Sequence, residues 1–126
     1  MSPHRRQPEA QLQRSVLDHL RWRGAPGLFV FHYPAGGWRS SVEAAIFKSL
    51  GVVAGVPDLL IVYQGQLYAL EIKTAHGRPT ATQVETQERL RAAGAIVATA
   101  VEIDAALERL EEWGLLRPNV SIRRAS

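Results

Sequence analysis

Two apolar runs of strand length, separated by a short turn, lie in the middle of the chain. They span residues 59–63 and 67–72 and are rich in Leu, Ile, Val and Tyr, which favour strands. Gln64 and Gly65 lie between them, and glycine readily adopts the positive φ of a tight turn. Neither run alternates strictly between apolar and polar positions. We therefore predict a hairpin of two central strands, each buried on both faces.

Apolar positions on either side of the hairpin predict the other elements. Leu12, Val16 and Leu20 recur at helical spacing, for example, and Gly24 follows as a helix terminator. The predicted elements are a helix from about Pro8 to Gly24, a strand over 28–33, a helix over 42–50, a helix from Thr80 to Gly94, a strand over 95–101 and a helix over 104–113. This order implies an α/β fold, with a mixed sheet and helices on both faces.

Length and composition indicate one domain with one core. The chain has 126 residues, and its 46% of hydrophobic and 21% of charged residues are usual for a soluble globular protein. It has no cysteine, which excludes disulfides and thiolate metal sites. No apolar run reaches the ~18 residues of a membrane span, and no secretory signal is evident, so we expect a cytoplasmic protein. We expect residues 1–7 and 118–126 to be flexible tails.

Three charged residues stand at one end of the apolar hairpin. With a two-residue turn, paired positions sum to 129, so Asp58 stands directly opposite Glu71. Two opposed carboxylates repel, and a divalent cation with oxygen ligands is the natural counter-charge. Lys73 lies two residues after Glu71 and projects on the same face. The alternative is a turn residue at strand entry, Asp58, with Glu71 and Lys73 on a solvated strand end.

The same residues resemble a nuclease signature. Pro57 and Asp58, then twelve residues, then Glu71-Ile72-Lys73 look like the PD-(D/E)xK pattern. The surrounding residues narrow the resemblance: Gly51, Gly55 and Val56 before the hairpin, and Gly77, Thr80, Gln83, Leu90, Gly94 and the run from Ile96 after it. The whole resembles the stand-alone form of the virus-type replication-repair nuclease (VRR-NUC) domain. The resemblance runs from about Glu9 to Trp113 and is densest from Gly51 to Gly94.

This resemblance implies a restriction-endonuclease-like core and a divalent-metal-dependent DNA nuclease. Asp58 and Glu71 would bind Mg²⁺ or Mn²⁺, with the backbone carbonyl of Ile72 as a further ligand. Lys73 would position or deprotonate the attacking water, or offset charge in the transition state. In the resembled family an acid on the first helix reaches the metal site, and Glu9 matches it. A first-turn glutamate favoured by the helix dipole is the alternative for Glu9.

Gln83 has two interpretations, one structural and one functional. Thr80 and Gln83 are spaced as a capping box at the start of a helix. The resembled family places a glutamine here beside the active site, so Gln83 could also orient Lys73 or a water. In this helix we expect Val84 and Leu90 to face the sheet, with Gln87 as a further candidate for that face.

Candidate DNA contacts lie in loops and on an exposed helix. Gly37, Trp38 and Arg39 follow a glycine-containing turn, where the backbone can approach a ligand, an indole can stack and a guanidinium can bind phosphate. Further candidates are Lys48 and Arg78. A plain loop is the alternative, and His32 just before it is either a satisfied structural histidine or a ligand.

Net charge agrees with a polyanionic partner without establishing one. The chain carries +3, with 15 basic and 12 acidic residues; if Glu9, Asp58 and Glu71 bind metal, 12 − 3 = 9 acidic residues remain. The resemblance, in contrast, implies a structure-specific endonuclease that cuts branched DNA as a homodimer, in the manner of a Holliday junction resolvase, because the stand-alone members of the resembled family look like junction resolvases. The alternatives are a catalytically inactive nucleic-acid-binding module and a metal-dependent hydrolase of small phosphates, for which no P-loop is present.

Overall fold

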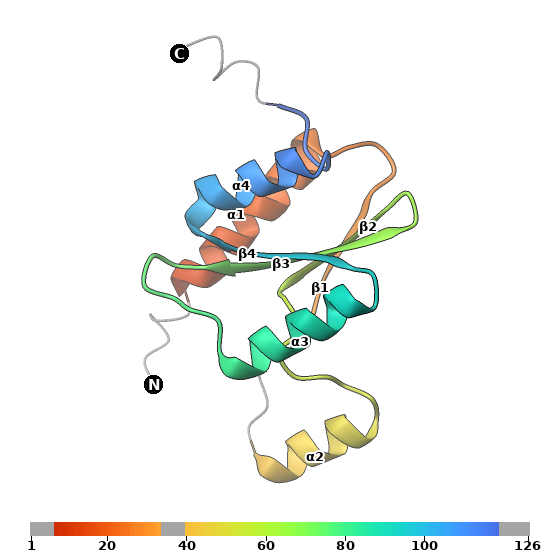
Figure 1. The fold of residues 1–126 in the computed structure, drawn as a ribbon. Coiled ribbons are helices and arrows are strands. Elements are labelled where there is room, and N and C mark those ends of the chain that lie inside the picture. Colours follow the sequence, from red (N-terminus) through yellow and green to blue (C-terminus); the bar gives the residue numbers. More distant parts are fainter. Residues whose placement is uncertain (1–6, 34–39, 119–126) are drawn as a thin grey trace.

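The computed structural model describes residues 7–33 and 40–118, and its elements follow the predicted order (Figure 1). They are α1 (Gln7–Arg23), β1 (Phe29–His32), α2 (Ser41–Ser49), β2 (Leu59–Tyr63), β3 (Gln66–Lys73), α3 (Ala81–Ala92), β4 (Ile96–Val101) and α4 (Glu102–Glu112). Most of the two predicted tails lies outside the described residues, as does the loop with Gly37, Trp38 and Arg39. No helix in the described ranges is both long and apolar enough to cross a membrane.

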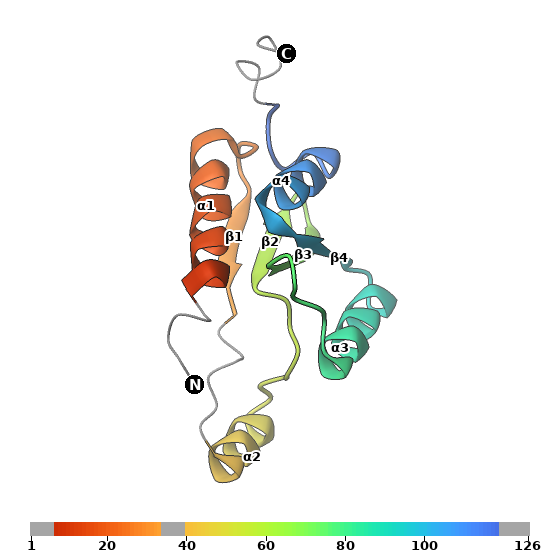
Figure 2. The ribbon, with the colours of Figure 1, turned by 90° about the vertical axis from the view of Figure 1, so that its left-hand side faces the viewer.

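The four strands form one mixed sheet in the order β1-β2-β3-β4. The first two pairings are antiparallel, and β4 joins β3 in parallel after the chain has passed through α3. Helices α1 and α4 lie on one side of the sheet and α3 on the other, whereas α2 stands apart from the sheet in both views (Figures 1 and 2). The predicted mixed sheet with central hairpin strands and helices on both faces is confirmed.

The hairpin turn explains why the strands pair as they do. Gln64 and Gly65 both have positive φ, 51° and 78°, which is the combination of a type I′ turn. This turn pairs Tyr63 with Gln66 and, at the other end of the ladder, Leu59 with Leu70. The predicted register, in which paired numbers sum to 129, is confirmed.

The main core lies between the sheet and the pair α1 and α4. Its buried residues come from alternate positions of the strands, from the inward stripes of both helices and from the segment that follows α4. They are Val16, Leu20, Leu59, Ile61, Leu70, Ile72, Ala98, Ala100, Ala106, Leu110, Leu115 and Leu116. A buried ion pair between Arg23 and Glu111, with Nη1 and Oε2 2.8 Å apart, ties α1 to α4 at the edge of this core.

The structure corrects two expectations about helices. The last helix begins at Glu102, directly after β4, and not at Asp104; Glu102 has a φ of 66°, which turns the chain without a loop. In α3, Val84 is 43% exposed, so the expectation that it faces the sheet was wrong. Thr86 and Gln87 are buried in its place, and Leu90 packs against the smaller cluster of Leu60, Ala69 and Val97. The inward face of α3 is therefore largely polar.

Candidate active site at the open end of the hairpin

Two carboxylates meet where the hairpin strands are farthest from their turn. Asp58 immediately precedes β2, and continuing the observed ladder by one position sets it opposite Glu71. Glu71 is only 3% exposed. Its burial, and next the nearby charge of Asp58, raise the pKa of Glu71 from 4.5 to about 7, although the positive charge of Lys73 acts in the other direction. The two carboxylates that the sequence analysis predicts to oppose each other therefore lie close enough to interact, although the observed ladder itself ends at Leu59 and Leu70.

Lys73 lies on the same face of β3 as Glu71, as alternation along the strand requires. Its Nζ is 3.3 Å from Oε2 of Glu71, and the residue is 9% exposed. Burying two charges is costly unless they are paired, so this ion pair offsets the desolvation of both. It leaves one ammonium and two carboxylates around the same point.

Gln83 joins this group from the first turn of α3. Its backbone N–H donates to Oγ1 of Thr80 (3.1 Å), and its Oε1 accepts from the backbone N–H of Thr80 (2.9 Å), which completes the predicted capping box. Its Nε2 donates to Oε2 of Glu71 at 3.3 Å. The helix cap and the contact with the site thus use different atoms of one amide, and the bond goes to Glu71 and not to Lys73.

One carboxylate oxygen has no partner. Oε1 of Glu71 is buried and accepts no hydrogen bond among the described residues. An unsatisfied buried polar atom typically costs about 1–3 kcal/mol, so native proteins seldom keep one without a reason. The oxygen set of Asp58 and Glu71 fits Mg²⁺ or Mn²⁺, since Mg²⁺ is commonly held by one or two carboxylates together with waters and substrate phosphates.

Other candidate residues are not gathered at this point. Glu9 is exposed in the first turn of α1, and the described residues contain no group of three His, Asp or Glu side chains able to hold a metal. Ile72, whose backbone carbonyl is an expected ligand, sends its side chain into the main core. Lys48 in the last turn of α2 and Arg78 in the loop after β3 are both exposed.

The face of the sheet under α3 also holds Thr86 and Thr99, which the sequence analysis did not single out, and Gln87, which it named as a candidate for this face. Thr99, which pairs with Glu71 across β3 and β4, accepts a hydrogen bond from Nε2 of Gln87 (3.1 Å). The Oγ1 of Thr86 donates to the carbonyl of Ala54 (2.7 Å), three residues before Pro57. The spacing of Gln83, Thr86 and Gln87 places them on one side of a helix, and that spacing was the available signal.

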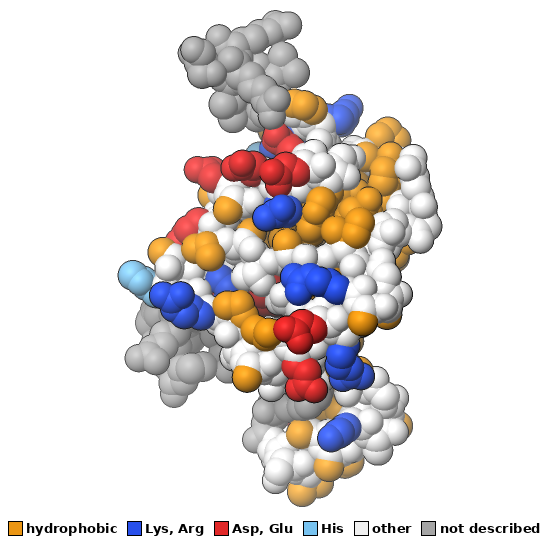
Figure 3. Space-filling view, in the orientation of Figure 1, with side chains coloured by type: hydrophobic (Ala, Val, Ile, Leu, Met, Phe, Trp, Pro, Cys, Tyr) orange, Lys and Arg blue, Asp and Glu red, His pale blue; other side chains and the backbone are white. Residues whose placement is uncertain are grey.

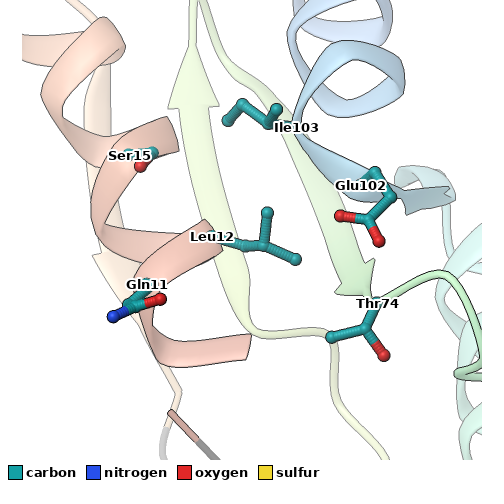
Figure 4. A pocket seen from close by; sticks show the side chains of 6 residues that line it. All are labelled: Gln11, Leu12, Ser15, Thr74, Glu102 and Ile103. Atoms are coloured by element: carbon teal, nitrogen blue, oxygen red, sulfur yellow. The ribbon is translucent and has the colours of Figure 1, made fainter. Parts of the chain in front are cut away.

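A separate hollow of about 380 Å³ lies between α1, the end of β3 and the start of α4 (Figure 4). It is lined by Gln11, Leu12, Ser15, Thr74, Glu102 and Ile103. Because α1 and α4 cover the face opposite to Glu71 and Lys73, this hollow does not contain the carboxylate pair. The Glu102 carboxylate accepts the backbone N–H of Ala75 at 2.7 Å, so it holds the loop that follows Lys73.

The molecular surface is unevenly charged. Acidic side chains gather over α4 (Figure 3), the helix that carries Glu102, Asp104, Glu108, Glu111 and Glu112. This acidic helix covers the face of the sheet that does not hold Glu71 and Lys73. A polyanion that reaches the carboxylate pair would therefore approach from the side away from α4.

Comparison with known proteins supports the resemblance through structure and not through sequence models. No protein-family model and no curated protein matches the chain. A solved structure described as a VRR_NUC domain protein has a TM-score of 0.68 and 28% identity, and the match covers 82% of this chain and 85% of that one. Another, described as a VRR_NUC domain, has a TM-score of 0.56 and 23% identity over 82% and 94% of the two chains and shows the fold alone.

This protein therefore has the α/β fold of VRR_NUC structures, which are PD-(D/E)xK-like. Asp58 and Glu71 lie at the end of the hairpin that is far from its turn. Both the predicted resemblance and the predicted fold class are confirmed. Each match extends over most of this chain and most of the solved structure.

Proposed function

We propose that this protein is a divalent-metal-dependent nuclease that hydrolyses DNA phosphodiester bonds at the open end of the β2–β3 hairpin. One observation supports this most strongly: Glu71 is buried with a free carboxylate oxygen, opposite Asp58 and paired with Lys73. A structural ion pair needs only one acid and one base. A second carboxylate beside Glu71 and an unpartnered oxygen destabilise the protein unless a cation binds there or Glu71 takes up a proton.

Each residue has a role that follows from its atoms. Asp58 and Glu71 would hold the cation, which would supply Lewis-acid polarisation of the phosphate and lower the pKa of the attacking water. Lys73, held beside the carboxylates by its ion pair, places positive charge where negative charge develops during hydrolysis. Gln83 keeps the Glu71 carboxylate turned toward the site. Glu9 and the carbonyl of Ile72 are proposed as supporting ligands.

Substrate binding would use basic residues on the side away from the acidic α4. Arg78 follows β3, and Lys48 lies on α2; both are exposed. Together with Gly37, Trp38 and Arg39 they are the proposed DNA contacts, through phosphates and base stacking. Branched DNA is the proposed substrate, by analogy with stand-alone members of the resembled family.

A homodimer is the proposed active form. One hairpin makes one site, and one site cuts one strand, whereas a two-fold dimer presents two sites to a two-fold symmetric junction. The candidate contacts are the outward face of α1 and helix α2. In α2 no residue is buried, and Val42, Ile46 and Leu50 are 69%, 53% and 73% exposed.

A cleavage assay separates this function from its alternatives. A four-way junction and a linear duplex of the same length are incubated with Mg²⁺, Mn²⁺ or EDTA, and light scattering gives the mass in solution. We expect metal-dependent cleavage with a preference for the junction, by a dimer. Binding without cleavage in either metal would instead identify an inactive nucleic-acid-binding module, and full activity in EDTA would refute the metal mechanism.

A further inference from the structure

The end of β1 forms hydrogen bonds with the backbone of Asp58, one of the two carboxylate residues of the site. The backbone carbonyl of Asp58 accepts two hydrogen bonds from this strand end: one from the backbone N–H of Tyr33 (3.2 Å) and one at Nδ1 of His32 (3.0 Å). Asp58 precedes β2, so the β2–β3 ladder itself ends at Leu59 and Leu70. These two bonds therefore fix Asp58 where regular strand pairing with β3 has stopped.

The chemistry of the carbonyl decides which nitrogen of His32 carries the proton. A carbonyl oxygen can only accept, so the bond to Asp58 requires a proton on Nδ1. Nε2 of the Gln13 side chain lies 2.9 Å from the same Nδ1, so a residue of α1 also reaches the imidazole. Nδ1 cannot both donate its proton to the Asp58 carbonyl and accept one from Gln13, so the bond to Asp58 belongs to the tautomer in which Nδ1 is the donor.

The segment that leads to Asp58 is held from the other side as well. The hydroxyl of Tyr33 accepts the backbone N–H of Val53 (2.9 Å), and Thr86 on α3 donates to the carbonyl of Ala54 (2.7 Å). At Gly55, with a φ of 80°, an added Cβ would lie 2.6 Å from the carbonyl oxygen of Thr82. Residues 53–58 are therefore held by contacts with Tyr33, just after β1, and with Thr82 and Thr86 on α3.

Hydrogen bonds that fix the backbone of Asp58 matter because the carboxylate of Glu71 lies nearby. Charge repulsion between Asp58 and Glu71 favours a movement of Asp58 away from the pair, because it is Asp58 that lies outside the ladder. A hydrogen bond to its own backbone carbonyl opposes that movement without occupying its carboxylate. We propose that His32 is a positioning residue that holds Asp58 in place for cation binding.

The consequence for cation binding and cleavage rests on the proposed function, whereas the consequence for the 53–58 segment does not. Residues that support a ligand from behind typically change metal affinity or activity by about 10–100-fold. The test should therefore measure the segment itself, the binding of a metal, and the reaction separately.

Three substitutions at one position provide the test. His32→Asn places an amide nitrogen where Nδ1 stands and keeps the donor; His32→Gln places it nearer to Nε2; His32→Ala removes it. Hydrogen–deuterium exchange over residues 53–59 in EDTA reports on the segment. Calorimetric titration with Mn²⁺ reports on the cation site, and single-turnover cleavage of a four-way junction reports on the reaction.

We expect His32→Ala and His32→Gln to speed exchange over residues 53–59 by about fivefold, the factor for one lost hydrogen bond of ~1 kcal/mol. We expect both to weaken Mn²⁺ binding by about tenfold. His32→Asn should stay within about threefold of the wild type in every readout. Thermal melting of each variant checks that the whole fold survives.

Two results would overturn the proposal. If His32→Ala has the same exchange rates over residues 53–59 and the same Mn²⁺ affinity as the wild type, the imidazole does not hold Asp58 in place. Equal damage in the Asn, Gln and Ala variants would show that ring packing matters and the donor does not. If the wild type neither binds Mn²⁺ nor cuts DNA, the proposed function fails, and the exchange data alone still decide whether His32 braces Asp58.

Discussion

The two faces of the sheet are built on opposite principles. The face covered by α1 and α4 is an apolar core in which Leu70 and Ile72 of β3 meet side chains such as Val16 and Leu110. The face covered by α3 uses the intervening positions of the same strand, Glu71 and Lys73. Under α3 the buried set includes Thr86 and Gln87 on the helix, while the apolar cluster has only Leu60, Ala69 and Val97 as buried members.

This difference shows how one strand can serve stability and chemistry together. Successive side chains of a strand point to opposite faces, so residues one position apart meet different environments. The apolar face stabilises the fold through burial of hydrocarbon. The polar face buries charges and an unpartnered oxygen, which lowers the stability of the protein without a bound cation.

The largest expected effect comes from removing charges on the polar face. Glu71→Gln and Lys73→Ala should each reduce cleavage by on the order of 10³-fold, because the charges that act on the phosphate are lost. DNA binding should largely remain. Single-turnover kinetics and a binding titration measure the two quantities, with Glu108→Gln on α4 as a matched control at an exposed position. Retention of wild-type cleavage in either variant would remove that side chain from the site.

A cavity on the apolar face should have the reverse effect. Leu110 is fully buried, and Leu110→Ala should lower the free energy of unfolding by about 2–5 kcal/mol. Cleavage per folded molecule should be unchanged at low temperature, because the site lies across the sheet. Urea unfolding measures the stability. A fall in the cleavage rate of fully folded protein would mean that the two faces are coupled.

On the polar face, Glu71 should make the stability of the protein depend on pH. The pKa of Glu71 is raised to about 7, so its contribution is fully present below pH 4.5 and is lost as the pH rises through 7. That change amounts to at most about 3 kcal/mol. Asp58→Asn removes one cause of the shift and leaves burial, so in EDTA it should flatten this dependence and raise the Tm above pH 7 by removing a repulsion of about 1 kcal/mol.

Thermal melting from pH 5 to 8 in EDTA measures this effect. Glu108→Gln, which changes an exposed carboxylate elsewhere, should leave the shape of the profile as in the wild type. A clear loss of Tm in Asp58→Asn above pH 7 would contradict a close carboxylate pair.

The smallest net effect should come from making the polar face apolar at the Gln87–Thr99 hydrogen bond, which lies beside Glu71 in the sheet. Gln87 and Thr99 satisfy each other, so Gln87→Leu or Thr99→Val alone should cost about 1–3 kcal/mol by leaving one partner unpaired. The double variant should return to within about 1 kcal/mol of the wild type. Urea unfolding of the four proteins forms a double-mutant cycle. Simple additivity of the two losses would show that the pair is not coupled.

Local patterns predicted much of the fold and the centre of the site. The turn at Gln64 and Gly65 determines the strand register, and continuing that register by one position brings Asp58 opposite Glu71. The capping box at Thr80 determines where α3 begins, and hence where Gln83 stands. In each case the decisive contacts lie within a few residues or follow by arithmetic along the hairpin.

Contacts between distant segments were not predictable in the same way. Val84 was expected to face the sheet because apolar residues usually point inward, but α3 covers a polar surface and turns Thr86 and Gln87 toward it. The bond of His32 to Asp58 joins two segments whose approach depends on the pairing of β1 with β2. The start of α4 depends on a positive φ at Glu102, which a non-glycine residue rarely adopts.

The hairpin turn also implies an order of events during folding. Hairpins joined by short turns form in about 1–10 μs, whereas β4 pairs with β3 only after α3 has crossed the sheet, as Tyr68 and Ile96 are 96 − 68 = 28 residues apart. Asp58 and Glu71 therefore approach each other in water, before burial raises the pKa of Glu71. Glu71 becomes buried only when α3 and β4 dock. We expect the late, slow phase of folding to take up a proton near neutral pH, and the early phase to be insensitive to it.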